Sequence, residues 1–307
     1  MNTPKVIYIG GHGRSGTTNV DRVLSEVTGG FSAGEIHRFW AYGLAKNWKC
    51  SCREKLRECE FWGPVLRQSF KEVGSSEEEI LEAWKAVVRP HSLLSLWYPS
   101  LRSARFQRQL MLYRSFLEVL YRTVAQRSGT RVIVDSSGSP LHGYVLAGLG
   151  EIDVAMVHLV RDVRAVAFSN QKQKPNPSAP APDATMRTKP FPRVAATWML
   201  YNYLLEGLEA EVDTYTLAKY EELFATPQTR FGGLANKMGI ESMVEDVFRG
   251  DRVCLSSEHT GQGNPVRYKK GIEKLAPDTE WVEKMSRVKE RFMAHVCKTR
   301  LEKYSYL

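Results

Sequence analysis

The sequence lacks any long hydrophobic run, although it has 307 residues. A membrane-spanning helix needs about 18 or more consecutive apolar residues, and no segment of the chain provides them. Only four residues precede Lys5, where a β-branched run begins, and they leave no space for a secretory signal peptide. These two absences predict a cytoplasmic protein without a membrane span.

Cysteines are few, and their number is odd. The chain has five cysteines, and an odd count without secretory features argues against structural disulfides. Cys50, Cys52 and Cys59 lie close together, but they lack the Cys-x2-Cys spacing of zinc sites and a recognisable fourth ligand. The sequence therefore predicts no metal site.

Acidic residues are fewer than basic ones. The chain has 34 aspartates and glutamates against 43 lysines and arginines, for a net charge of +9. This excess predicts an anionic partner without choosing among nucleic acid, a membrane surface and a small polyanion. With 43% apolar and 25% charged residues, the composition is that of a globular protein and excludes disordered, collagenous and coiled-coil classes.

The order of apolar patterns predicts an α/β protein. Helical spacing follows the first strand-like run and ends near Gly29, and further helical patterns separate the later runs. Buried strands linked by helices form parallel sheets, so we expect a doubly wound, three-layer α/β/α fold. The strand-like runs are Val6–Ile9, Arg131–Val134, Val154–Val160 and Thr214–Leu217.

The remaining segments predict a single domain over residues 1–307 with two additions. Apolar periodicity predicts one long helix over 103–127 and another over about 278–300, the latter capped by Asp278 or Thr279. Residues 36–130 form a helical insertion in this interpretation. Residues 174–192 hold six prolines and predict a long mobile loop of the kind that covers sites.

A glycine-rich segment joins the first predicted strand to the first predicted helix. Gly11 and Gly16 have the spacing of a Walker A loop, but Thr17 stands where a nucleotide kinase has lysine. A basic side chain appears earlier in the loop as Arg14. The amides and dipole of a helix N-terminus attract anions, and an arginine adds paired charged hydrogen bonds. The segment therefore predicts an anion site.

A second basic segment follows another predicted strand. Arg161 comes directly after the run that ends at Val160, and Ser169 lies eight positions later in a helical pattern. The carboxyl ends of strands in an open α/β sheet are where ligands bind, so both residues are candidates for a ligand site.

Together these two segments resemble the sulfotransferases that use 3′-phosphoadenosine 5′-phosphosulfate (PAPS). The resemblance implies a P-loop NTPase-like fold, PAPS as donor and 3′,5′-adenosine bisphosphate (PAP) as product. It implies that Arg161 and Ser169 bind the 3′-phosphate. It implies that the 5′-phosphosulfate contacts Gly13, Arg14, Ser15, Gly16, Thr17 and Thr18, with Arg14 stabilising the leaving oxygen.

Two weaker similarities extend the resemblance. Tyr220, in Lys219–Leu223, matches a family tyrosine beside the donor nucleotide. Gly263, Asn264 and Arg267 match a Gly-Asn-Pro-x-Arg loop of bacterial members and are expected to close over the nucleotide.

The candidate general base is Glu35. It lies 21 positions after Arg14, which is where tyrosylprotein sulfotransferases carry a glutamate. His37 is an alternative, because cytosolic small-molecule sulfotransferases use histidine. Asp135 is a third candidate, in a segment similar to the family's Asp-Ser-Ser-Lys-x-Pro motif, where Gly138 replaces the usual lysine.

The hypothesis from the sequence is a PAPS-dependent sulfotransferase that transfers a sulfuryl group to a hydroxyl. The acceptor stays open among carbohydrate, lipid, peptide tyrosine and secondary metabolite. Two alternatives are a P-loop nucleotide kinase or NTPase, which the missing lysine disfavours, and a basic nucleic-acid-binding protein, which only the charge suggests. The oligomeric state is not predicted.

Overall fold

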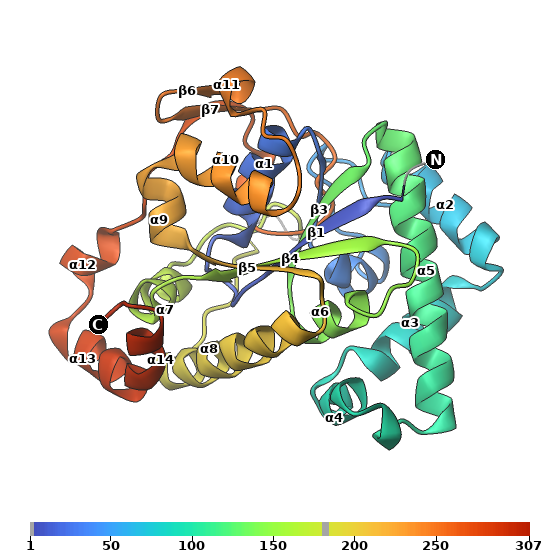
Figure 1. The fold of residues 1–307 in the computed structure, drawn as a ribbon, viewed down its shortest axis with the longest axis horizontal. Coiled ribbons are helices and arrows are strands. Elements are labelled where there is room, and N and C mark those ends of the chain that lie inside the picture. Colours follow the sequence, from blue (N-terminus) through green and yellow to red (C-terminus); the bar gives the residue numbers. More distant parts are fainter. Residues whose placement is uncertain (1–2, 180–183) are drawn as a thin grey trace.

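A central sheet of five parallel strands organises the protein (Figure 1). The computed structural model describes residues 3–179 and 184–307. The strand order is β2-β3-β1-β4-β5, so β1 lies at the centre. All four predicted strand-like runs are confirmed as strands, although β3 begins at Val132 rather than at Arg131 and extends further, to Gly138. The strands are β1 Lys5–Gly10, β2 Phe31–Gly34, β3 Val132–Gly138, β4 Asp153–Val160 and β5 Thr214–Lys219.

Both faces of the sheet are buried, because alternate side chains of β1 enter different cores. Val6 and Tyr8 belong to one apolar cluster, and Ile7 and Ile9 belong to another. The first cluster packs against α2 Trp62–Val73, α3 Glu77–Val87, α5 Ala104–Ser128 and α6 Pro140–Leu146. The second packs against α1 Thr17–Thr28, α9 Tyr220–Ala225 and α10 Pro227–Lys237. The three-layer α/β/α prediction is confirmed.

The long helix predicted over 103–127 is present as α5. The Ser103 hydroxyl caps it by accepting a hydrogen bond from the Phe106 N–H at 3.1 Å, and Gly129 ends it with a φ of 73°. Helices also fill most of the segment between β2 and β3, where the insertion over 36–130 is expected. These comprise α2, α3, α4 Leu93–Trp97 and α5, with a short 3-10 and a π segment before α2 and further 3-10 segments on either side of α4.

The single helix predicted over 278–300 is wrong. The segment forms α12 Glu280–Lys284, α13 Arg287–Val296 and α14 Lys298–Lys303. Extended backbone at Met285 separates α12 from α13 (φ −79°, ψ 131°). This break lets buried Met293 and Leu301 reach a third core with α7 Val163–Gln171 and α8 Phe191–Glu206, while Val288 is left 80% exposed.

Two segments outside the central sheet differ from the prediction. The proline-rich segment ends earlier than residue 192, because α8 begins at Phe191, and residues 180–183 lie outside the described residues. A small antiparallel sheet of β6 Phe248–Arg249, β7 Arg252–Leu255 and β8 Gly271–Lys274 was not predicted, and α11 Val244–Val247 precedes it. Within the described chain, no helix combines the length and apolarity that a membrane crossing requires.

A buried carboxyl on α1 should make stability depend on pH. Asp21 is fully buried, accepts a hydrogen bond from the Ser136 hydroxyl at 2.5 Å, and burial raises its pKa to about 7. The unfolded carboxyl loses its proton near pH 4, so the free energy of unfolding should fall between about pH 4 and pH 7. Asp21→Asn should remove on the order of 4 kcal/mol of that fall.

Urea unfolding across this pH range measures the effect. Asp246→Asn, at an exposed carboxyl, is the matched control and should keep the wild-type pH dependence. Identical pH dependence in wild-type protein and Asp21→Asn would contradict the prediction.

Candidate active site

A polar cavity of about 240 Å³ opens at the carboxyl ends of the parallel strands. The segments that follow β1, β2, β4 and β5 all contribute to it, as expected for a ligand site of an open α/β sheet. Most of the lining residues are ones that the sequence predicts. The cavity is lined by Gly13, Arg14, Gly16, Thr17, Thr18, Asn19, Glu35, Arg38, Arg161, Ser169, Lys174, Met186, Tyr220, Asn264, Val266 and Asp278.

The glycine-rich loop brings the start of α1 to the cavity. Gly16 has a φ of 93°, and a Cβ at this position would lie 2.6 Å from the Tyr220 ring, so only glycine fits. No side chain caps α1 and no acidic residue lies in its first turn. The main-chain N–H groups of Thr17 and Thr18 and the positive end of the helix dipole are therefore available to an anion.

Arg14 links the loop to α7. Its Nε and Nη2 atoms donate to the main-chain oxygen of Ser169 at 3.3 and 2.8 Å. Its own main-chain oxygen accepts a hydrogen bond from Nη1 of Arg161 at 3.1 Å. Burial and the nearby Arg161 both lower the pKa of Arg14. The two predicted anion sites are thus parts of one cationic cavity.

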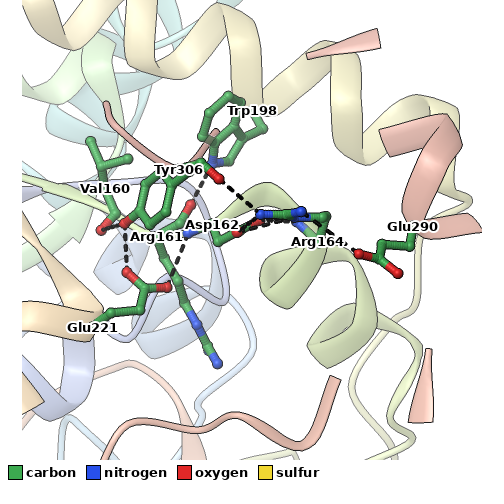
Figure 2. Close-up of polar contacts among 8 residues, drawn as sticks. All are labelled: Val160, Arg161, Asp162, Arg164, Trp198, Glu221, Glu290 and Tyr306. Atoms are coloured by element: carbon green, nitrogen blue, oxygen red, sulfur yellow. Dashed lines mark hydrogen bonds and ion pairs between the residues drawn. The ribbon is translucent and has the colours of Figure 1, made fainter. Parts of the chain in front are cut away.

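Buried side chains hold the main chain around Arg161 in place (Figure 2). The Trp198 indole N–H donates to the Arg161 carbonyl at 3.1 Å, and the next residue, Asp162, donates its N–H to Glu221 at 3.2 Å. Arg164 fixes the Asp162 carboxylate at 2.6 Å. In Figure 2 the Arg161 guanidinium points away from these groups. The buried network therefore orients the arginine without using its charge.

The Arg161 guanidinium stacks on an aromatic ring and forms an ion pair with a carboxylate. Its central carbon lies 4.4 Å from the centre of the Tyr220 ring, and Nη2 lies 3.2 Å from the Asp278 carboxylate. Tyr220 is buried, and burial is the main cause that raises its pKa, so this tyrosine is neutral. Asp278 is the carboxylate that an incoming anion would compete with for Arg161.

Glu35 enters the cavity from the end of β2. Its N–H donates to the Gln262 carbonyl at 2.8 Å, and its carboxylate lies 2.5 Å from Nε of Arg38. Burial raises the pKa of Glu35, while Arg38 and Arg267 lower it by less, so the net shift is upward. A carboxylate with a raised pKa accepts a proton more readily near neutral pH.

The two other candidate bases do not line the cavity. His37 is only half-buried, and desolvation lowers its pKa well below the ordinary value. Asp135 lies inside β3 with no exposed surface, where it accepts hydrogen bonds from the Tyr121 hydroxyl at 2.6 Å and the Ser137 N–H at 2.8 Å. Its lone pairs are thus occupied within the core.

Gly138 stands where the sulfotransferase motif that the sequence resembles has lysine, and the structure gives a reason for the glycine. Gly138 has a φ of 71°, and its carbonyl accepts a hydrogen bond from the Gly11 N–H at 3.2 Å. A Cβ at position 138 would lie 2.8 Å from the Gly11 carbonyl oxygen. A lysine therefore does not fit here, and the positive charge near the loop comes from other residues.

The residues of the Gly-Asn-Pro loop contribute unequally to the cavity. Asn264 lines the cavity and donates its N–H to the Thr18 hydroxyl at 3.4 Å, whereas Gly263 lies next to it with a φ of 145°. Arg267 is buried and donates to the carbonyls of Gly263 at 2.6 Å and Lys49 at 2.7 Å, so it anchors the loop. Ser15, also predicted, is buried and does not line the cavity.

Several lining residues were missed from the sequence. Arg38 follows Glu35 by three positions, a spacing that could have suggested the ion pair. Lys174 lies in the proline-rich segment, and burial together with Arg14 lowers its pKa. Asp278 was considered only as a helix cap. Among the described residues, no group that could hold a metal ion includes a residue of this cavity.

Comparison with known proteins supports the fold. No protein-family model and no curated protein matches the sequence. The sulfotransferase domain from the Synechococcus PCC 7002 olefin synthase aligns with a TM-score of 0.52 at 17% identity, over 97% of this chain and 95% of that domain. The sulfotransferase domain from the curacin biosynthetic pathway gives 0.51 and 15%, over 96% and 98%. The chain therefore has the α/β fold of sulfotransferase domains, as its sequence predicts.

Proposed function

We propose that the protein is a PAPS-dependent sulfotransferase that acts on a hydroxyl group. The observation that carries this proposal is the contact between Arg161 and the main-chain oxygen of Arg14, at 3.1 Å, on the wall of one cavity. It joins the anion site at the start of α1 to the one at the end of β4. A donor with a phosphosulfate at one end and a phosphate at the other matches two such sites.

The space around these arginines supports a nucleotide of this kind. A second cavity of about 190 Å³ adjoins the first and shares Asn19, Tyr220 and Val266 with it. We assign the phosphosulfate to the first cavity and the adenosine to the second. Thr17 in place of the Walker A lysine disfavours a nucleoside triphosphate at the same loop.

The reaction requires a base and charge stabilisation. In the proposed step the acceptor oxygen attacks the sulfur, the bond from sulfur to the 5′-phosphate oxygen breaks, and PAP leaves with the negative charge. Glu35 takes the proton of the attacking hydroxyl, and its raised pKa suits this role. Arg14 and the amides of α1 stabilise the leaving oxygen, as preorganised donors do for developing charge.

Thermal unfolding with nucleotides tests the donor. PAP should raise the unfolding temperature more than ATP at equal concentration, because only PAP carries a 3′-phosphate for Arg161. A ligand at roughly 100 times its dissociation constant stabilises by about 2.7 kcal/mol. Arg161→Ala should lose most of the response to PAP. A preference for ATP with magnesium would instead favour a kinase or NTPase, and no response to either nucleotide would end the proposal.

Replacing Arg14 tests the stabilisation of the leaving oxygen. Arg14→Ala should lower kcat by about 10²- to 10³-fold, the cost of removing one such donor. The measurement is transfer of labelled sulfate from PAPS to an accepted hydroxyl. Arg252→Ala changes an exposed arginine of β7 and should keep the wild-type rate. Equal rates for Arg14→Ala and Arg252→Ala would remove the assigned role.

Replacing Glu35 tests the general base. Glu35→Gln should reduce kcat by roughly 10²-fold or more while the thermal response to PAP persists. The wild-type rate should rise with pH through the raised pKa of Glu35, because only the carboxylate accepts a proton, and this dependence should vanish in the variant. Glu82→Gln, at an exposed glutamate, is the control. Undiminished turnover of Glu35→Gln would exclude Glu35 as the base.

A further inference from the structure

A cluster of three cysteines and one histidine lies outside the proposed active site. Cys50 and Cys52 belong to a turn bracketed by a bridge between Lys49 and Lys55, and Cys59 lies shortly before α2. His259 comes from the segment after β7, 200 residues beyond Cys59. One ligand atom of each of the four residues lies within 4.8 Å of all the others.

The distances inside the cluster match the edges of a small tetrahedron. The Sγ atoms of Cys52 and Cys59 are 3.6 Å apart, and Sγ of Cys59 is 3.4 Å from Nδ1 of His259. A tetrahedral zinc ion with its usual bond lengths would separate two sulfur ligands by about 3.8 Å and a sulfur from a nitrogen by about 3.6 Å. The pair of cysteines is also too far apart for a disulfide, whose sulfurs are about 2.05 Å apart.

The histidine is oriented as a metal-binding histidine usually is. Nδ1 faces Cys59, and Nε2 lies 3.5 Å from the Glu60 carboxylate. A carboxylate at Nε2 favours the tautomer that carries its proton there, which leaves the Nδ1 lone pair for a metal. The Phe61 ring stacks on the imidazole at 5.6 Å, and the Trp62 indole donates to the His259 carbonyl at 2.6 Å. The stacking thus holds the imidazole ring, and the Trp62 hydrogen bond holds the main chain of His259.

The sulfur ligands are also shielded and supported. Cys50 and Cys59 are buried, and the main-chain N–H of Trp62 lies 3.5 Å from Sγ of Cys59 as a donor. Three thiol groups and an imidazole form a soft donor set, which selects zinc over magnesium or calcium. Four protein ligands fill a tetrahedral ion completely and leave no open position for a substrate.

We propose that Cys50, Cys52, Cys59 and His259 bind one structural zinc ion. The sequence predicts no metal because it shows no fourth ligand near the cysteines, and the fold supplies that ligand from a distant segment. The ion would tie the turn at residues 50–59 to the segment that continues into Gly263 and Asn264. The Ser51 N–H already donates to the Thr260 carbonyl at 3.0 Å along this junction. The zinc would thus fix one wall of the cavity without entering it.

Metal analysis of the full-length protein tests the proposal. Protein purified without chelators from zinc-supplemented medium should contain about one zinc ion per chain by mass spectrometry of the metal. Protein grown with cobalt should show the thiolate-to-cobalt charge-transfer band and the intense visible bands of a tetrahedral ion. Wild-type protein that holds neither zinc nor cobalt, or a disulfide between Cys52 and Cys59 in mass spectra, would overturn the proposal.

Matched variants separate a ligand from a packing role. His259→Ala should lose the zinc, whereas His259→Cys should retain it, because cysteine can replace histidine as the fourth ligand. Cys254→Ser changes an exposed cysteine on β7 and should keep the full zinc content. Extraction of zinc by a chelator should lower the unfolding temperature of wild-type protein and leave that of His259→Ala unchanged. Zinc retained equally in His259→Ala and wild-type protein would refute the ligand assignment.

Discussion

The hydrogen bond from Arg161 to the main-chain oxygen of Arg14 is the contact on which the cavity depends. It holds two cationic side chains beside the same space, and Arg161 pairs there with the Asp278 carboxylate. The arginines come from segments 147 positions apart, after β1 and after β4. Because β1 and β4 are neighbouring parallel strands, their carboxyl ends bring both segments to one edge of the sheet.

Buried polar networks behind the cavity give this arrangement its rigidity. The Trp198 indole and Glu221 fix the main chain around Arg161, and the guanidinium points away from both of these groups. The Gln262 carbonyl fixes the main chain of Glu35 in a similar way. In both cases the main chain is held by groups that do not neutralise the functional side chain.

Local sequence predicted the elements whose signals are contained within a few residues. The strand-like runs, the capped helix α5 and the glycine loop before α1 have such signals, and the structure has all of them. The prediction of a single helix over 278–300 failed because its helical spacing continues through Met285, where the chain turns to bury Met293 and Leu301. Which apolar residues become buried depends on what packs against them, and periodicity alone does not record that.

The sequence by itself determined the fold class and the motifs that carry charge, because apolar periodicity and glycine spacing are local properties. Tertiary structure alone decided which charged groups share one space. It placed Glu35 beside Arg38 in the cavity. It left Asp135 inside the sheet, where its carboxylate accepts a hydrogen bond from the Tyr121 hydroxyl. It also brought His259 to the three cysteines, since a neighbour 200 positions away leaves no pattern in the chain.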